Sequence, residues 1–335
     1  MTPFDRILDE ARADPRHLVM AEGEDPRIVA GSARAVRDGV ARITLVGSRA
    51  RVEAELNRQQ IDASTLTIVD PADAPETEAF AQSFFQLRKH KGIDEAAAAA
   101  AVREPLTFAA LMVREGHAEG TIGGAVATTA DTVRAALQII GRAAHSHMVS
   151  SFFLMLLDKA HHPVQDTLIF ADCGLVVEPE MDELAEIARA SAGSYRSLVR
   201  QTPRVAMLSF STHGSARHAR VIKVAEATRL VREKEPDLLI DGDLQFDAAF
   251  VPAIAKAKAP SSPIEGAANV FVFPSLEAAN IAYKVAERIG GAKAIGPILQ
   301  GLAEPANDLS RGCSADDVHQ MIAVTVVQAQ ANRRS

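Results

Sequence analysis

The feature that most constrains this chain is the regular alternation of short strand-like runs with longer helix-like segments. Such alternation is typical of α/β proteins, in which helices cover the faces of a mostly parallel sheet. The runs are rich in aliphatic and β-branched residues and end near Gly, Pro or Asp. They predict strands near residues 17–22, 43–47, 66–71, 120–124, 168–172, 204–210, 238–242 and 269–274.

The helix signals divide the chain into two parts. Asp25 followed by Pro26 predicts an N-cap and a first helical residue, with the helix continuing to residue 37. Helices are also predicted over 94–114, 131–142 and 315–330. The pattern loosens at 141–150, and 335 residues suffice for two domains. We therefore expect one α/β domain from 1–147 plus 296–335 and a second from 148–295, with a ligand cleft between them.

Composition narrows the class of protein. With 47% apolar and 24% charged residues the chain is expected to fold, and it lacks an apolar run of the ~18 residues that a membrane helix needs. A net charge of -7 and the absence of Trp argue against nucleic acid as a partner. Two cysteines make no disulfide framework, and the first residues lack an export signal. These observations predict a cytoplasmic protein that acts on small molecules, with no membrane partner.

A glycine turn at residues 123–134 precedes a predicted helix and contains several polar groups. Unpaired amides at a helix start attract anions, Arg134 lies about one turn further on, and Thr128 or Thr129 could add a hydroxyl. The alternative is that Thr128 is only an N-cap paired with Asp131. Residues 87–92, which include Arg88, form a second candidate for phosphate binding, or else a solvated cationic helix end.

Residues 308–317 concentrate a hydroxyl, a guanidinium, a thiol and carboxylates, enough for a nucleophile, an anion clamp and a base. The alternative is a capping box between Ser314 and Asp317. Cys313 has no His near it in sequence, and most cysteines are buried hydrophobes. Asp241, Asp243 and Asp247 could instead bind Mg²⁺, although carboxylates are common at strand ends.

Three segments of the chain form a specific set of motifs. They are Leu-Arg-Lys-His-Lys-Gly at 87–92, Leu-Ile-Asp-Gly-Asp-Leu-Gln-Phe-Asp-Ala-Ala at 239–249, and Gly-Pro-Ile-Leu-Gln-Gly through Asp-Leu-Ser-Arg-Gly-Cys-Ser at 296–314. In this order they resemble the phosphate acetyltransferase (phosphotransacetylase) family, within the phosphate acetyl/butyryltransferases. The resemblance runs from residue 22 to the last helix. It implies reversible acetyl transfer between acetyl phosphate and coenzyme A without a cofactor, a fold similar to isocitrate and isopropylmalate dehydrogenases, and a homodimer.

The resemblance also implies roles for individual residues. The family's catalytic positions fall on Ser310, Arg311 and Asp317, and its coenzyme A arginines fall on Arg88 and Arg134. Thr129 stands where some members have Ser and keeps a hydroxyl that could contact the substrate. The chain departs from the family pattern at Val176 and Val177, where an Asn is lost, and at His213, where Lys is common.

These residues fit a direct attack of the coenzyme A thiolate in a ternary complex. A thiol with a pKa near 8.5 needs a base at neutral pH, a role we assign to Asp317, while Ser310 orients the thiol and Arg311 binds phosphate. Three alternatives remain. They are a phosphate butyryltransferase, an NAD-dependent decarboxylating dehydrogenase that uses the Asp241–Asp247 carboxylates with Mg²⁺, and a non-catalytic regulatory module.

Overall fold

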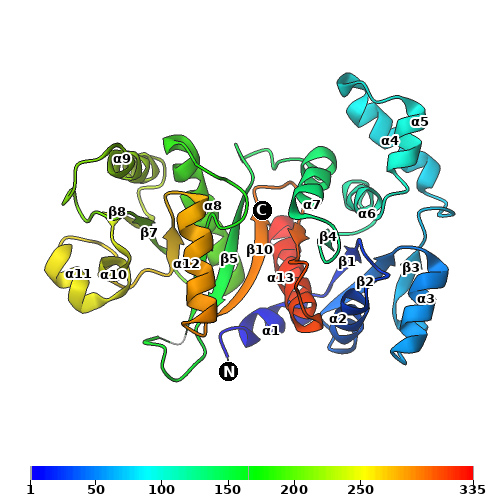
Figure 1. Cartoon of the computed structure of the whole chain (residues 1–335), viewed down its shortest axis with the longest axis horizontal. Coiled ribbons are helices and arrows are strands. Elements are labelled where there is room, and N and C mark those ends of the chain that lie inside the picture. Colours follow the sequence, from blue (N-terminus) through cyan, green and yellow to red (C-terminus); the bar gives the residue numbers. More distant parts are fainter. Residues whose placement is uncertain (1, 165, 335) are drawn as a thin grey trace. The chain divides into compact units, whose positions relative to one another are not determined.

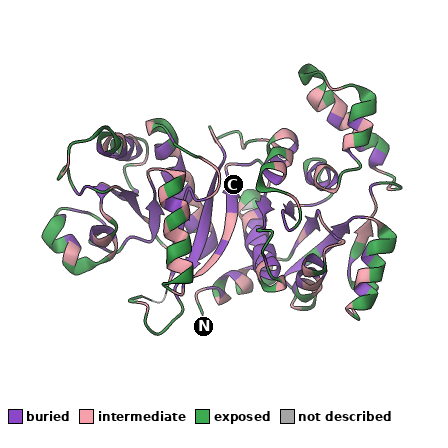
Figure 2. Cartoon of the chain, in the orientation of Figure 1, coloured by how far each residue is buried: buried purple, intermediate pink, exposed green. Residues whose placement is uncertain are grey.

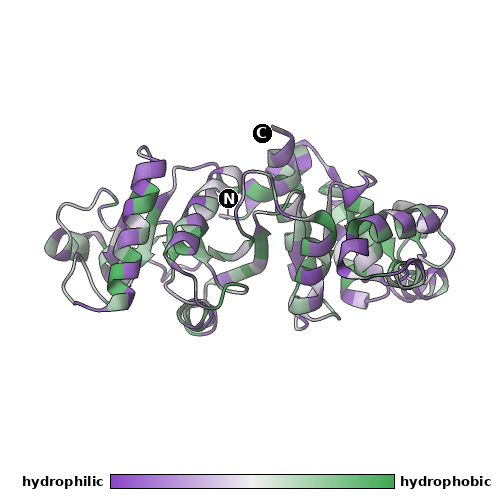
Figure 3. Cartoon of the chain, turned by 90° about the horizontal axis from the view of Figure 1, so that it is seen from above, coloured by the Kyte–Doolittle hydropathy of each residue, from purple (hydrophilic) through white to green (hydrophobic). Residues whose placement is uncertain are grey.

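The computed structural model describes residues 2–164 and 166–334 and divides into two compact units. The first unit comprises residues 7–146 and 302–334, and the second comprises residues 2–6 and 147–301. In each unit most strand residues are buried while the outer faces of the helices are exposed (Figure 2). Hydrophilic and hydrophobic residues accordingly alternate around the outer helices (Figure 3).

The first unit is built on a five-stranded sheet in the order β11-β4-β1-β2-β3, in which every pair is parallel. Its strands are β1 (Arg16–Met20), β2 (Ala41–Val46), β3 (Thr67–Val69), β4 (Gly120–Gly123) and β11 (Ala306–Asp308). Its helices are α1 (Asp5–Ala13), α2 (Pro26–Arg37), α3 (Arg49–Arg58), α4 (Thr77–Arg88), α5 (Glu95–Ala101), α6 (Pro105–Arg114), α7 (Thr129–Ala135) and α13 (Ala315–Arg334). The first two residues of α1 belong to the second unit. A π-helical turn at Ala136–Ile140 extends α7.

Helix α13 closes the first unit by packing against α2, β1 and β4 (Figure 1). The approach to α2 is so close that a Cβ on Gly31 would lie 2.6 Å from the Cβ of Val318. Only glycine fits such an approach without a shift of one helix. The packing brings the last segment of the chain, residues 302–334, onto the sheet made by the first 146 residues.

The second unit contains a six-stranded sheet in the order β10-β5-β6-β9-β7-β8, with β10 and β5 antiparallel to their neighbours and the others parallel. Its strands are β5 (Ser150–Leu156), β6 (Thr167–Ala171), β7 (Arg204–Leu208), β8 (Leu239–Leu244), β9 (Val270–Val272) and β10 (Lys293–Gln300). Its helices are α8 (Met181–Val199), α9 (Ala219–Lys234), α10 (Phe246–Phe250), α11 (Pro252–Lys258) and α12 (Leu276–Arg288).

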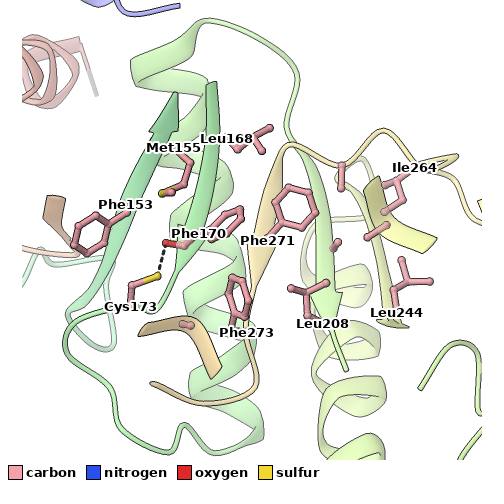
Figure 4. Close-up of a cluster of buried hydrophobic side chains, with 14 of the residues drawn as sticks. Phe153, Met155, Leu168, Phe170, Cys173, Leu208, Leu244, Ile264, Phe271 and Phe273 are labelled. Atoms are coloured by element: carbon pink, nitrogen blue, oxygen red, sulfur yellow. Dashed lines mark hydrogen bonds between the residues drawn. The ribbon is translucent and has the colours of Figure 1, made fainter. Parts of the chain in front are cut away.

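Aromatic side chains from β5, β6 and β9 form much of the core of the second unit (Figure 4). Phe170 lies 5.4 Å from Phe271 and 5.1 Å from Phe273 between ring centroids, in tilted or edge-on contacts that aromatic rings prefer. The Cys173 thiol is buried beside this cluster and donates to the Phe170 carbonyl at 3.2 Å. Burial raises the pKa of this thiol well above its usual range, so it remains protonated.

The predicted α/β class with mostly parallel sheets is confirmed, and each predicted strand overlaps one in the structure. The sequence pattern missed β5, β10 and β11. The helix predicted over 94–114 was wrong as one element, because Pro105 begins a separate helix, α6, and α5 ends at Ala101. No single helix in the described part of the chain could cross a membrane, although α5 and α6, bent by 97°, pass the length and composition test as a pair.

Candidate active site

The candidate site lies in the first unit, where the connections after β1 and β4 diverge. From β1 the chain proceeds to β2 and β3 on one side of the sheet and then returns to β4 on the other side. In parallel sheets ligands bind beyond the carboxyl ends of the strands at such a reversal. A cavity of about 690 Å³ opens here, lined by residues that follow β1, β2 and β4, including Glu22, Gly47 and Val126.

The amides after β4 are held by a carboxylate from the segment after β1. Glu22 accepts hydrogen bonds from the amides of Ala125 (2.7 Å), Val126 (3.1 Å) and Ala127 (2.7 Å). These successive N–H groups form the kind of nest that binds an anion. The sequence left two interpretations open for this turn, an anion at the helix start or only an N-cap at Thr128. In the structure the amides of residues 125–127, just before that helix, are bonded to the chain's own carboxylate.

Arg27, in the first turn of α2, connects three segments of the site. Its guanidinium donates to both carboxylate oxygens of Asp25, at 3.0 and 2.8 Å. It also donates to the carbonyls of Ala125 (2.7 Å), Arg311 (2.6 Å) and Cys313 (3.3 Å). Burial opposes ionisation of Asp25, but the hydrogen bonds and charge of Arg27 prevail and lower its pKa.

The turn at residues 309–314 presents the predicted catalytic side chains to solvent. Ser310 and Arg311 are exposed, and the Ser310 carbonyl accepts the amide of Cys313 at 2.9 Å. The Ser310 hydroxyl oxygen accepts the Gly312 amide at 3.2 Å, so its proton is free for another acceptor. Within the described residues the Arg311 guanidinium makes no hydrogen bond or ion pair, which leaves it available to an anion.

Asp317 lies in the first turn of α13 and makes the capping box that the sequence offered as an alternative. Its Oδ2 accepts from the Ser314 amide and hydroxyl, both at 2.8 Å, and the Ser314 oxygen accepts the Asp317 amide at 3.2 Å. Its Oδ1 has no hydrogen-bond partner in the parts of the chain that the structure describes. One oxygen thus starts the helix while the other can receive a proton.

Asp308 is a buried carboxyl group beneath this turn, at the end of β11. Its Oδ2 accepts from the Thr129 hydroxyl at 2.6 Å, whereas its Oδ1 is buried without a partner among the described residues. A Cβ at Gly124, whose φ is +93°, would lie 2.0 Å from that oxygen, so only glycine fits there. Burial raises the pKa of Asp308 to about 6, and the nearby Glu22 adds to the increase.

Cys313, in the same turn, has a buried side chain. Burial raises the pKa of its thiol, and the carboxylates of Asp317, Asp25 and Glu22 add to the increase against the opposing charge of Arg27. A thiol kept protonated in this way is a poor nucleophile.

The two arginines expected to bind coenzyme A lie in different settings. Arg134, on α7, lines the cavity and pairs with Asp131 at 2.6 Å, while Thr128 caps α7 through the Asp131 amide. Arg88 is the last residue of α4 and is half-buried. It has no hydrogen bond or ion pair with any described residue, and it does not line the cavity, although Phe84 one turn earlier does.

The carboxylates considered for Mg²⁺ lie in the second unit and already have protein partners. Asp241 accepts from Arg232 at 2.7 Å and contacts the His213 ring at 3.0 Å, and Asp247 pairs with Lys258 at 2.8 Å. Asp243 accepts the Gly214 amide at 3.3 Å, and among the described residues no three His, Cys, Asp or Glu side chains are grouped so that they could hold a metal ion. His213, one of the departures from the family pattern, therefore contacts a buried acid.

Sequence reasoning did not assign Glu22, Arg27 or Asp308 to the site. The available signal was the run Glu-Gly-Glu-Asp-Pro-Arg at 22–27, directly after the first strand, which was interpreted only as a helix start and as the beginning of the family resemblance. Asp308 was seen only as the beginning of the 308–317 cluster. The positions of these side chains depend on partners as far as 286 residues away in sequence.

Comparison with known proteins covers nearly the whole chain. The family described as Phosphate acetyl/butaryl transferase matches residues 3–326. A phosphate acetyltransferase of Paracoccus denitrificans is 48% identical over 330 residues, which cover 98% of this chain and all of that protein. One of Bacillus subtilis is 41% identical, covering 97% of this chain and 98% of that protein.

A solved structure gives the same result. A phosphotransacetylase from Streptococcus pyogenes superposes with a TM-score of 0.92 at 39% identity and covers 98% of both chains.

Proposed function

Because the chain belongs to the phosphate acetyl/butaryl transferase family, we propose that it is an acyltransferase that moves an acetyl group reversibly between acetyl phosphate and coenzyme A. The observation that carries the proposal is the match along the whole chain to phosphate acetyltransferases. In addition, Ser310 and Arg311 are exposed, and Asp317 Oδ1 has no hydrogen-bond partner among the described residues. Both substrates are small molecules, as the sequence predicted.

In the proposed reaction the coenzyme A sulfur attacks the acetyl carbon of acetyl phosphate directly. Asp317 takes the thiol proton on Oδ1, the carbon–oxygen bond to phosphate breaks, and phosphate leaves with the bonding electrons. Ser310 orients the sulfur. Arg311 binds the phosphoryl group and stabilises the charge that develops on the carbonyl oxygen. The free guanidinium of Arg311 and the free hydroxyl proton of Ser310 support these roles.

Direct transfer is favoured over an acyl-enzyme on Cys313. The burial and raised pKa of that thiol support this choice, since the thiolate is the attacking species. No metal or redox cofactor is required in this mechanism, because each substrate charge has a proposed cationic or hydrogen-bonding partner in the chain.

Coenzyme A is proposed to bind through Arg134 and Arg88, with Thr129 near the reacting groups. The place of Arg134 on a 690 Å³ cavity at the sheet reversal supports this assignment. Thr129 is also engaged by Asp308, so its hydroxyl can serve the substrate only as an acceptor or through that carboxyl. We further propose a cytoplasmic homodimer, on the family resemblance.

Three alternatives have less support. A phosphate butyryltransferase differs by two methylenes of acyl chain, and each methylene contributes only ~1–3 kcal/mol of discrimination. A metal-dependent dehydrogenase would need Asp241 and Asp247, which are paired with cationic side chains. A regulatory module without activity would not need the Ser310, Arg311 and Asp317 arrangement.

The experiment is thioester formation by the purified chain from coenzyme A and acetyl, propionyl or butyryl phosphate, with and without excess chelator. We expect the highest kcat/KM with acetyl phosphate and no effect of the chelator. Preference for butyryl phosphate would support the sister activity. Loss of activity in chelator that Mg²⁺ alone restores would overturn the metal-free mechanism.

A further inference from the structure

We propose that Arg27 is a positioning residue for acetyl transfer, which holds the turn carrying Ser310 and Arg311 in its reactive arrangement and thereby sets kcat. The inference rests on the proposed function. Arg27 lies in α2, 284 residues from Arg311 in sequence, and the family resemblance assigned it no role.

The first support is that the guanidinium is fully used. Arginine has five N–H donors, and here Nε and Nη2 bind the Asp25 carboxylate, Nη2 binds the Ala125 carbonyl, and Nη1 binds the carbonyls of Arg311 and Cys313. Asp25 fixes the plane of the group, because its two oxygens engage Nε and Nη2 together. No donor remains for a substrate, which separates Arg27 from a substrate-binding arginine.

The second support is which backbone atoms it binds. Arg311 and Cys313 bracket the glycine of the turn, so their carbonyls determine how residues 310–313 lie. Within the described residues no other side chain donates to these two carbonyls. A displacement of about 1 Å in such a turn can reduce a rate about a hundredfold.

A third observation distinguishes the two loops that Arg27 touches. The turn after β4 has a second anchor, because Glu22 accepts three of its amides. By contrast, the 310–313 turn is held by hydrogen bonds within the turn itself and by Arg27. Loss of Arg27 should therefore loosen residues 310–314 more than residues 125–127.

The test compares Arg27→Ala and Arg27→Lys with Arg37→Ala, a control on the same helix whose side chain is 74% exposed. In acetyl transfer we expect kcat to fall about ten- to a hundredfold in both Arg27 variants, with KM for coenzyme A nearly unchanged. Lysine should not replace the arginine, because one ammonium group cannot bind all the acceptors that the planar guanidinium contacts from its three nitrogens. The control should match wild type.

Two readouts separate positioning from a general loss of folding. Methylguanidinium should partly restore Arg27→Ala, whereas methylammonium at equal ionic strength should not. Hydrogen exchange should become faster at the 310–314 amides and stay slow at 125–127. If Arg27→Ala does not fold, Arg27→Lys carries the same comparison.

A normal kcat in Arg27→Lys, a loss that lies only in KM for coenzyme A, or unchanged exchange at 310–314 would each overturn the inference. A wild-type chain without acetyl transfer activity would overturn the proposed function instead. The exchange experiment would still decide whether Arg27 holds the turn.

Discussion

At the scale of single residues, Asp317 shows how one carboxylate can serve both helix capping and proton transfer. Oδ2 is used by Ser314 at the start of α13, and Oδ1 is unengaged within the described chain. The sequence presented the two roles as alternatives. The structure provides a separate oxygen for each, so the capping geometry does not argue against a role as base.

Replacement of Asp317 by Asn tests the role as base. The amide oxygen can still accept from Ser314, so we expect only a small change in melting temperature. Loss of the proton acceptor should lower kcat at least about a hundredfold. Asp316→Asn is the matched control, since Asp316 is exposed and pairs with Arg34. Near-normal kcat with clearly lower stability would leave Asp317 as a helix cap only.

Asp308 predicts a pH dependence of stability. The pKa of Asp308 is about 6 in the folded chain, against a reference value of 3.8 for an ordinary Asp. The protonated carboxyl therefore stabilises the folded state below pH 3.8, and this contribution is lost as the pH rises through 6. Asp308→Asn keeps an acceptor for Thr129 and removes the titration. We expect its stability relative to wild type to increase by up to about 3 kcal/mol between pH 4 and pH 7.

Urea denaturation of both proteins at several pH values measures this change. A difference between Asp308→Asn and wild type that does not vary with pH would show that the carboxyl titrates normally in the folded chain.

At the scale of elements, the sequence located β1 to β4 and helices α2, α7 and α13 of the first unit, but neighbouring elements decide what their residues do. The signal Asp25–Pro26 correctly predicted the start of α2 at Pro26. Arg27, in the same turn, also binds residues 311–313. This contact could not be predicted without the position of β11, and β11 has only three residues, too few to show periodicity.

Helices α4 and α7 present the two arginines assigned to coenzyme A. We expect Arg88→Ala and Arg134→Ala to raise KM for coenzyme A about ten- to a hundredfold, because a charge-assisted contact contributes ~1.5–3 kcal/mol. Arg58→Ala, on the exposed face of α3, is the control. Steady-state kinetics with varied coenzyme A gives the answer. Unchanged KM in both variants would make these arginines structural.

At the scale of the whole molecule, each unit has its own sheet and buried core. The first unit is closed by chain segments from both ends of the sequence. This arrangement puts the residues after β1, β4 and β11 at one edge of one sheet, so the proposed reaction groups come from three distant segments of sequence. The predicted domain boundaries at 147/148 and 295/296 stay a prediction.

The sequence by itself determined the α/β class, the start of α2, the candidate residues 308–317 and the family resemblance. These depend on local periodicity, capping and short motifs, which are written in neighbouring residues. Only the tertiary structure decided that Glu22 accepts hydrogen bonds from the amides after β4, that Arg27 binds the carbonyls of Arg311 and Cys313, and that burial raises the pKa of Asp308. Each of these depends on groups that the parallel sheet brings together from more than 100 residues apart, and burial and contact at such distances leave no local pattern.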